Sequence, residues 1–545
     1  MITKILKHLT IITFYLIAVN TLAQNNSARP RLVVGIVVDQ MRWDFLHRYT
    51  EKYSAGGFKK LIMEGYNCEQ TYINYFPTYT APGHASIYTG SVPAIHGITG
   101  NNWFDNTARR VVYCTEDTTV NSLGESKKSG QHSPVNMFTT TICDELRIAT
   151  NFKSKTVGIA LKDRGAILPA GHAATAAYWY EGNTGNWISS SYYMKELPTW
   201  VKKFNEQKLA EKYVKQNWKT LLELATYTES TEDDKWYENP FSNEDKPVFI
   251  HKTSEIKKEP LTEVLRSTPF GNTLTFEFAK AAIEGDTLGQ RKATDFLAIS
   301  FSSTDYIGHQ FGPNAIETQD AYLRFDLELE DFLTYLDKKI GKGNYLLFLT
   351  ADHGAAHATG FNKEKHIPAG NIFEKAIFKY ADSLLQLKYR QKNLISAVIN
   401  QQIFLNHDNI LTANLSVGEI SHYLAEKLNT LQGIDRVIVY QNLQQTPLPA
   451  WFRECLNNHY KPGRTGDLQL LFHPAWFNEF ERGTTHGSIF PYDTHIPLIF
   501  YGWNIKPGKD YSRTYITDIA PTLSALLKIQ EPNGSIGKVI TGLFK

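Results

Sequence analysis

Residues 32–39 read LVVGIVVD, an apolar run without a polar interruption that ends in an acidic side chain. Four later runs are also mostly apolar: residues 156–161, 296–301, 345–350 and 497–501. Because apolar and polar residues do not alternate in them, we expect strands that are buried on both faces of a parallel sheet. Polar residues able to do chemistry follow four of the five runs: Asp39, Lys162, Asp305, and Asp352 with His353.

Helices are expected between these strands, at residues 58–64, 137–148, 319–338 and 519–527. The last of them has Asp518 in the N-cap position and Pro521 in its first turn, two preferred helix-start signals. The alternation of strands and helices predicts an α/β fold with a doubly wound, mostly parallel sheet and helices on both faces. Ligands of such sheets bind beyond the carboxyl ends of the strands, where the polar residues named above are placed.

Two regions interrupt the alternation, at about residues 173–270 and 371–481. The first is rich in Trp, Tyr, Lys and Glu and has a helical stretch near 200–224. The second has a strand-like segment at 436–440 and a helix-like segment at 417–428. We interpret both regions as insertions that cap or flank the site.

The N-terminus has the pattern of an export signal. Lys4 and Lys7 precede an apolar run at residues 9–19, and a small-residue cleavage site follows. The alternative, an uncleaved membrane anchor, is disfavoured because the run is shorter than the ~20 residues of a membrane span. We therefore expect residues 1–23 to be removed, leaving a catalytic domain of residues 24–545 without a membrane span, in the bacterial periplasm or the medium.

Charge balance and cysteine usage limit the classes of function. The chain has 57 basic and 55 acidic residues, and removal of the signal leaves 55 of each, so nothing supports a general role at nucleic acids or membrane surfaces. In an oxidising compartment the four cysteines allow up to two disulfides in three pairings. Their spacing is not that of a zinc ribbon, and we interpret them as structural or free: Cys68, Cys114, Cys143 and Cys455.

Three aspartates and three histidines lie at or after the expected strand ends: Asp39, Asp305, His309, Asp352, His353 and His486. The spacing of Asp305 and His309 places both on one side of a helical turn. Any one pair occurs commonly as a cap or a turn, but the six together at one edge of a sheet indicate a metal centre. Oxygen and nitrogen donors in this ratio suit Zn²⁺, with Mn²⁺ or Fe as alternatives. Two ions about 3.5–4 Å apart can hold both oxygens of an in-line displacement.

Thr80 stands at the start of an expected helix, in FPTYTAPGHASIYTG (residues 76–90). Pro82 suits the first turn, and small and apolar residues continue the helix. The N–H groups and the dipole of a helix N-terminus favour an anion there. A threonine hydroxyl is a poor nucleophile unless a metal ion or a base activates it, so without the metal ligands Thr80 would be interpreted as an N-cap.

These motifs together resemble the alkaline phosphatase superfamily, and within it the threonine-nucleophile, phosphate-irrepressible (PafA-type) alkaline phosphatases. The resemblance covers nearly the whole chain after the signal, and each motif alone is weak while their joint occurrence is specific. It is carried by VVDQMR with Asp39, TAPGH with Thr80, HGITGN with Asn101, KDR with Lys162 and Arg164, DYIGH with Asp305 and His309, ADHG with Asp352 and His353, and THG with His486.

The resemblance implies a role for each of these positions. One Zn²⁺ would be held by Asp305, His309 and His486. The other would be held by Asp39, Asp352 and His353 and would also bind and activate Thr80. In this branch the lysine of the KDR motif occupies the space of a third metal, so two Zn²⁺ and no third Mg²⁺ are expected.

Asn101, Lys162 and Arg164 would contact the phosphoryl oxygens. We expect Lys162 and Arg164 to face one pocket because alternate residues of an extended segment point the same way. Arginine can bind two phosphoryl oxygens at once, and lysine supplies a point charge. Taken alone, the same two residues could be solvated charges after a strand.

The implied activity is that of an alkaline phosphatase with a broad range of small-molecule phosphate monoesters. Thr80 attacks phosphorus, a phosphothreonine intermediate forms, and its hydrolysis releases inorganic phosphate. Positioning and charge dominate phosphoryl transfer, so little acid–base chemistry by side chains is needed. No dedicated nucleic-acid partner is expected, and a monomer is the working assumption.

The nearest alternative is a diesterase of the nucleotide pyrophosphatase type, which resembles the chain around Thr80 and Asn101. A monoester dianion carries more charge than a diester monoanion, so the cations Lys162 and Arg164 favour the monoester. A sulfatase is disfavoured because no Cys- or Ser-x-Pro-x-Arg motif is present, and a cofactor-independent mutase because its nucleophile is serine. A non-catalytic exported binding protein would lack a ligand or the nucleophile, and none is missing here.

Overall fold

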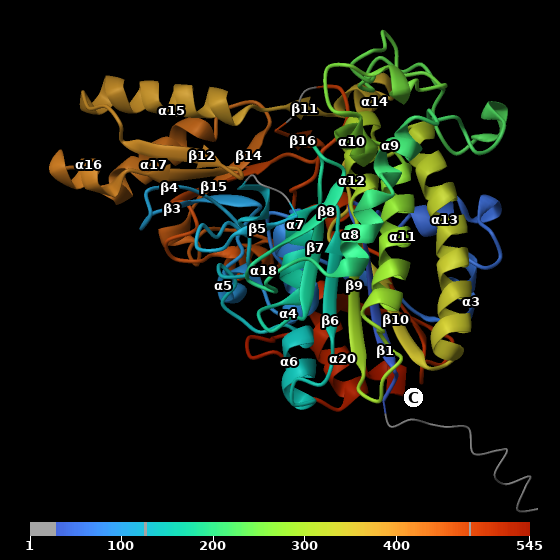
Figure 1. Cartoon of the computed structure of the whole chain (residues 1–545). Coiled ribbons are helices and arrows are strands. Elements are labelled where there is room, and N and C mark those ends of the chain that lie inside the picture. Colours follow the sequence, from blue (N-terminus) through green and yellow to red (C-terminus); the bar gives the residue numbers. More distant parts are fainter. Residues whose placement is uncertain (1–28, 125–127, 479–480, 545) are drawn as a thin grey trace, which may run out of the picture.

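The computed structural model of the chain describes residues 29–124, 128–478 and 481–544. The expected signal, residues 1–23, lies outside this part of the chain. A large sheet runs through the molecule in the order β17-β2-β18-β10-β1-β9-β6-β7-β8-β5, with β19 paired to β2 (Figure 1). No helix in the described ranges is long and apolar enough to cross a membrane.

Five adjacent parallel strands form the centre of this sheet. They are β10 (Tyr345–Thr350), β1 (Leu32–Val38), β9 (Asp295–Phe301), β6 (Thr156–Ala160) and β7 (Ala176–Glu181). β1 lies between β9 and β10, with Val34 beside Leu297 and Leu347. Every residue of these strands is buried, as the unbroken apolar runs predict for β1, β6, β9 and β10. β7 was not predicted as a strand.

The outer strands are mostly antiparallel, so the sheet is mixed. They are β18 (Leu498–Gly502), β2 (Tyr66–Tyr72), β17 (His495–Ile496), β8 (Asn186–Ser190) and β5 (Ser122–Leu123), while β19 (Gly508–Tyr515) is parallel to β2. β18 contains the last of the five predicted runs and is antiparallel to β10. An apolar run indicates that both faces of a strand are buried, but it does not indicate whether the neighbouring strands are parallel or antiparallel. The sequence of β18 therefore did not distinguish it from the parallel strands.

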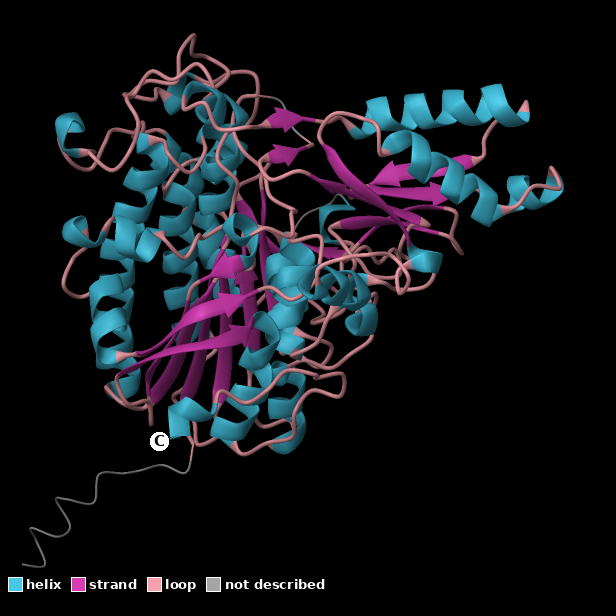
Figure 2. Cartoon of the chain, turned by 180° about the vertical axis from the view of Figure 1, so that it is seen from behind, coloured by secondary structure: helices cyan, strands magenta, loops and turns pink. Residues whose placement is uncertain are grey.

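Helices cover both faces of the sheet, in two sets whose members contact one another (Figures 1 and 2). One set is α3 (Phe58–Glu64), α8 (Thr199–Glu206), α11 (Phe270–Gly285) and α13 (Ile316–Leu336). The other set is α4 (Thr80–Thr89), α6 (Ile142–Ala149), α7 (Asp163–Ala170) and α20 (Ile519–Leu527). This arrangement confirms the predicted α/β class.

One helix start differs from the prediction, and one helix that starts as predicted lacks the expected capping bond. α6 begins at Ile142 rather than at residue 137, because Thr141 and Asp144 form a capping box there. Asp518 does stand at the N-cap position of α20, but it makes no capping bond. Its carboxylate instead accepts from the backbone N–H of Lys538 (2.7 Å), which anchors the C-terminal segment.

The second interrupting region forms a smaller sheet of its own beside the large one (Figure 1). Its antiparallel strands lie in the order β12 (Ile395–Ile399), β13 (Gln402–Leu405), β15 (Leu468–Phe472) and β14 (Ile434–Val439). α15 (Glu374–Tyr389) and α17 (Val417–Leu428) pack on it around a separate hydrophobic core. The predicted helix at 417–428 and the predicted strand near 436–440 are both present.

The first interrupting region begins inside the large sheet. β7 and β8 fall after residue 173, so the sheet continues past the boundary expected from the sequence. β7 contains the aromatic residues Tyr178, Trp179 and Tyr180. Because the segment after it is also rich in aromatic residues, composition did not distinguish this strand from the predicted insertion. The later part of this region has α8, α9 (Leu209–Val214) and α10 (Leu261–Val264) joined by long loops.

Each of the four cysteines is a buried free thiol: Cys68, Cys114, Cys143 and Cys455. Of the two states left open by the sequence, disulfide-bonded or free, the second applies. Burial is the largest cause of the raised pKa of these thiols, so none of them has the character of a reactive thiolate.

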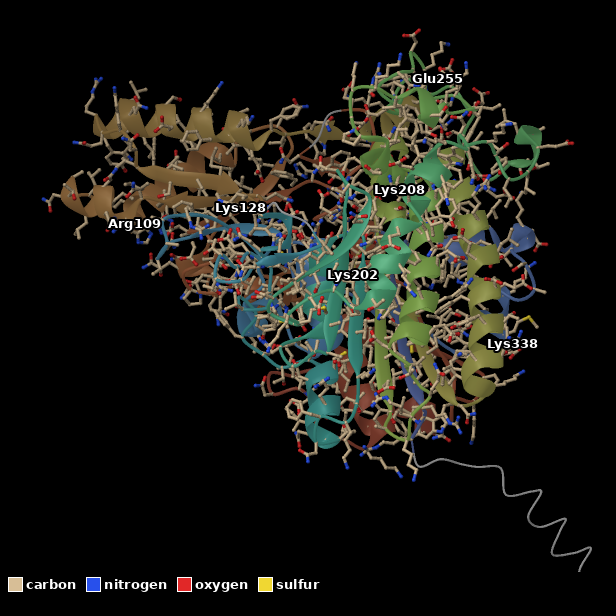
Figure 3. All side chains as sticks on the ribbon, in the orientation of Figure 1. Arg109, Lys128, Lys202, Lys208, Glu255 and Lys338 are labelled. Carbon is tan, nitrogen blue, oxygen red and sulfur yellow. The ribbon has the colours of Figure 1, made fainter. Side chains whose placement is uncertain are left out.

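Charged side chains of both signs extend from the surface. Figure 3 shows Lys202, Glu255 and Lys338 pointing outward from different parts of the chain, and all three are exposed. This agrees with the near-zero net charge of the chain without its signal.

His251 ties the first interrupting region to the helix layer. Its Nδ1 lies 3.1 Å from a carboxylate oxygen of Glu244, and its Nε2 lies 3.1 Å from Glu317 at the start of α13. Both His251 and Glu317 are fully buried. Burial alone would lower the pKa of His251, but hydrogen bonds to the two carboxylates raise it to about 9.

We expect the free energy of unfolding to fall as the pH rises through about 9. The folded pKa of His251 is above its ordinary value of 6.5, so its contribution to stability is complete below that value and lost above about 9. The loss is at most about 3 kcal/mol. Urea unfolding at a series of pH values measures it. His251→Gln should flatten the profile, and His422→Gln, at an exposed histidine of α17, should not. Identical profiles for wild type and His251→Gln would contradict the assignment.

Candidate active site

The three predicted carboxylate ligands meet at the carboxyl end of the central strands. Asp39 directly follows β1, and its backbone N–H donates to Phe301 O at the end of β9 (3.1 Å). Asp305 lies in α12 (Ser303–Phe311), just after β9, and Asp352 follows β10. Because β9, β1 and β10 are adjacent and parallel, their ends bring the three carboxylates together.

The three predicted histidine ligands share one arrangement. Each donates from Nδ1 to a backbone carbonyl: His309 to Thr484 (2.7 Å), His353 to Gly354 (3.0 Å) and His486 to Thr78 (2.7 Å). Each Nε2 then faces a carboxylate, 3.2 Å from Asp305 for His309, 3.7 Å from Asp305 for His486, and 3.5 Å from Asp39 for His353. Partners of this kind fix the tautomer of a metal-binding histidine and leave the Nε2 lone pair for the ion.

Two groups of these atoms are close enough to hold a metal ion each. One is Asp39, Asp352 and His353, the set predicted from the sequence. The other is Asp305, His353 and His486, and the ligand atoms within each group lie within 4.8 Å of one another. His309, expected in the second group, lies beside it through its contact with Asp305, while His353 belongs to both groups.

The chemistry of the two groups fits divalent cations. Asp39 Oδ1 is buried and accepts no hydrogen bond from any described residue. Burial, and after it the charges of Asp305 and Asp352, raise the pKa of Asp39 well above its usual range. Burial and the neighbouring His353 lower the pKa of His486, which keeps that imidazole neutral and able to bind a metal. A cation beside these groups would satisfy the orphaned oxygen and reduce the repulsion between the carboxylates.

Lys162 lies between the two groups of ligands. Its Nζ is 2.6 Å from Asp39 Oδ2 and 2.5 Å from Asp305 Oδ2, and its side chain is 3% exposed. Burial by itself would lower the pKa of Lys162, but the two carboxylates raise it, so the ammonium group is charged. The lysine therefore already balances part of the negative charge of the site.

The prediction that Lys162 and Arg164 alternate along one extended segment is wrong. Lys162 is extended, but it is the N-cap of α7, and Arg164 lies within that helix, so the alternation of an extended segment does not apply. The two side chains nevertheless line one cavity of about 250 Å³, together with Tyr113 and Tyr306. Arg164 donates from its guanidinium to Tyr113 OH (3.1 Å).

Thr80 is the first residue of α4 and is buried. The N-cap of this helix is Tyr79, so the alternative of Thr80 as an N-cap does not hold. Thr80 Oγ1 lies 3.5 Å from His353 Nε2, and His353 belongs to both ligand groups. The helix approaches the strand end closely, because a Cβ on Gly83 would lie 2.6 Å from Asp352 O.

Asn101 lies beside the same helix start. Its Oδ1 accepts from the backbone N–H of Ala81 (2.9 Å), the residue after Thr80. This bond orients the amide and leaves its two N–H groups as donors.

Two supporting residues were not predicted from the sequence. Gln40 Nε2 donates to Asp305 Oδ1 (2.7 Å), and its backbone N–H donates to Asp352 Oδ1 (3.2 Å). The left-handed backbone of Gln40 (φ 64°) turns the chain after Asp39. The only sequence signal for its supporting role was its position next to Asp39. His84 is the second supporting residue, although a lone histidine is most often a packing residue. Its Nδ1 lies 2.9 Å from Thr80 O and 3.3 Å from Asp352 Oδ2.

Comparison with known proteins gives one consistent family. Residues 33–495 match the model of the type I phosphodiesterase / nucleotide pyrophosphatase family. The chain is 50% identical over 518 residues to alkaline phosphatase PhoV of Synechococcus elongatus, covering 95% of this chain and 94% of that protein. It is 45% identical over 523 residues to alkaline phosphatase PafA of Elizabethkingia meningoseptica (95% and 96%). A protein of Myroides odoratus named calcium-transporting ATPase is 49% identical over 523 residues (95% of each chain).

A solved structure has the same fold over almost the whole chain. The crystal structure of wild-type alkaline phosphatase PafA superimposes with a TM-score of 0.92 at 44% identity, covering 95% of this chain and 99% of that one. The chain therefore belongs to the type I phosphodiesterase / nucleotide pyrophosphatase family of the alkaline phosphatase superfamily, among relatives of the PafA type.

Proposed function

We propose that this protein is an exported alkaline phosphatase that hydrolyses a broad range of phosphate monoesters, with Thr80 as the nucleophile and two Zn²⁺ as cofactors. The observation that carries the proposal is the position of Thr80 Oγ1, which is buried at a helix start and lies 3.5 Å from His353 Nε2. His353 belongs to both groups of candidate metal ligands. Relatives named alkaline phosphatases, similar over nearly the full chain, support it.

Asp39, Asp352, His353 and Thr80 would hold one ion, and Asp305, His309 and His486 the other. Two such ions, when bound, lower the pKa of the attacking hydroxyl and stabilise the oxygens of the in-line displacement. Lys162 contacts a carboxylate of each group, so we propose that it takes the place of a third metal ion and that no Mg²⁺ binds there.

The residues of the chain supply attack, orientation and charge. Thr80 loses its proton to water and forms a bond to phosphorus while the bond to the ester oxygen breaks, and that oxygen gains a proton from water. Asn101 donates to a phosphoryl oxygen, and Arg164 and Lys162 balance the negative charge that collects there. Water then cleaves the phosphothreonine, which frees Thr80 and inorganic phosphate.

Charge distinguishes this proposal from its nearest alternative, a nucleotide pyrophosphatase-type diesterase. A monoester dianion offers more negative charge to Lys162 and Arg164, which line one cavity next to the site. A diester needs room for a second ester group and gains less from two cations. A non-catalytic binding protein is the other alternative, and turnover separates it from both enzymes.

Hydrolysis assays should give a higher kcat/KM for p-nitrophenyl phosphate than for its methyl diester. The activity should be lost on treatment with a chelator and should return with Zn²⁺, because the ligand set otherwise leaves buried carboxylates unbalanced. A matched Mg²⁺ addition should not restore it. A wild-type protein that prefers the diester would refute the monoesterase assignment, and metal binding without any turnover would support the binding protein.

A further inference from the structure

A two-residue turn of the small sheet contacts two segments that carry residues of the candidate active site. β12 and β13 are joined by Asn400 and Gln401, since Ile399 pairs directly with Gln402. Both turn residues have a left-handed backbone, with φ of 57° and 59°. Two positive φ values in a two-residue loop mark the hairpin turn that suits the twist of antiparallel strands, for which Asn-Gly or Gly-Gly is preferred.

Gln401 is an unfavourable residue for its position in this turn. A side chain with a Cβ strains the left-handed backbone, and Gln lacks the tolerance of Asn or Gly for it. The residue is nevertheless buried, and its amide Nε2 donates to Gly487 O at 3.2 Å. Strain that persists at one residue is typical of a place where its side chain has a function.

Gln401 contacts the loop that contains His486, one of the candidate metal ligands. Gly487 follows His486, and its φ of +113° together with the Tyr79 ring, 2.7 Å from where a Cβ would lie, leaves room for glycine alone. Tyr79 precedes Thr80. Gly487, next to His486, is thus contacted both by the residue before Thr80 and by Gln401.

Asn400 makes an equivalent contact with the segment of Asn101. Its Nδ2 donates to Asn102 O at 2.6 Å, and it lies so close to Gly100 that a Cβ there would be 2.6 Å from it. Gly100 and Asn102 are the two neighbours of Asn101. The turn therefore contacts both the segment of Asn101 and the segment of His486.

The turn itself is held firmly by the small sheet. Gln401 O accepts from Gln469 Nε2 and from the backbone N–H of Leu470, both at 2.8 Å, and its own N–H donates to Glu374 (2.7 Å). Gln469 is fully buried. The turn can therefore transmit the rigidity of the small sheet to the two loops.

We propose that Asn400 and Gln401 are positioning residues, which fix the Asn101 segment and the His486 loop relative to each other. This inference rests on the proposed function for the roles of Asn101 and His486. It assigns the small sheet a task in catalysis, because one hairpin contacts the neighbours of both Asn101 and His486. Outer partners of a metal ligand commonly change metal affinity about 10–100-fold when they are removed.

Glycine variants test the proposal, because they remove the side chains and keep the turn. Gln401→Gly should hold the urea midpoint at or above that of wild type, since it relieves the strain. It should lose Zn²⁺ to a chelator about tenfold faster, and kcat/KM for p-nitrophenyl phosphate should fall about tenfold or more. Asn400→Gly should weaken the binding of inorganic phosphate, measured by calorimetry, and should retain Zn²⁺ like wild type.

Asn414→Gly is the matched control. Asn414 is an asparagine of the same region with a left-handed backbone (φ 56°), outside the small sheet, and it should behave like wild type in all four measurements. Unchanged Zn²⁺ retention in Gln401→Gly together with unchanged phosphate binding in Asn400→Gly would overturn the proposal. A loss of activity accompanied by a lower urea midpoint would also overturn it, because general destabilisation would then explain the loss. A wild type without phosphatase activity would refute the proposed function alone, because Zn²⁺ release and phosphate binding are measured without turnover.

Discussion

Thr80→Ala is expected to abolish hydrolysis of phosphate monoesters while the protein still folds and binds metal. The variant removes the only atom that we assign to the attack on phosphorus, and loss of a catalytic nucleophile costs on the order of 10⁴-fold or more in kcat. The fold should survive, because the N-cap of α4 is Tyr79 and Thr80 makes no capping bond. Steady-state kinetics and the metal content of the purified protein measure the two effects.

Two further threonine variants sharpen this test. Thr80→Ser keeps the hydroxyl and should retain activity and the covalent phosphoryl-enzyme, which acid quenching and mass spectrometry detect. Thr89→Ala removes a buried hydroxyl at the other end of α4, where it donates to Ala85 O, and it should leave kcat unchanged. Thr80→Ala with kcat within about tenfold of wild type would exclude Thr80 as the nucleophile.

The double variant Lys162→Ala/Arg164→Ala is expected to remove most of the preference for monoesters. Each cation stabilises charge on the phosphoryl oxygens, and loss of one such group costs about 10²–10³-fold. The loss should be large for p-nitrophenyl phosphate and small for its methyl diester, because the monoester carries more charge. The ratio of the two kcat/KM values is the measured quantity.

Arg266→Ala provides the matched control for the double variant. Arg266 lines the same cavity, but its guanidinium is paired with Glu263 (2.6 Å) and donates to Tyr180 O (3.0 Å). It should leave the ratio of monoester to diester hydrolysis unchanged. Metal content must be measured in parallel, since Lys162 contacts Asp39 and Asp305 and its removal leaves two buried carboxylates less balanced. A double variant that keeps the wild-type ratio would refute the role of these cations in discrimination.

The central strands and the ligands at their ends could be predicted from the sequence because one local signal indicates both. An unbroken apolar run marks a strand buried on both faces, and the residue after it marks the carboxyl end, so the positions of Asp39 and Asp352 follow from the sequence alone. The direction of β18 could not be predicted in this way, because its apolar run is the same whether its neighbour is parallel or antiparallel.

The remaining features of the site depend on contacts between distant residues. The pairing of Lys162 with Asp39 and Asp305 joins residues that are 123 and 143 positions apart, and nothing around Lys162 in the sequence specifies it. Gln40 and Gln401 act through a left-handed backbone that their residue type does not indicate. The helical state of Arg164 could not be predicted because KDR follows a strand directly and has no separating turn.

The four buried free thiols have a consequence for how the molecule is made. Packing and hydrogen bonds hold the described chain together without a covalent cross-link, so the native state needs no thiol oxidant to form. Folding should then proceed equally well in a reducing cytosol and in an oxidising space outside the membrane.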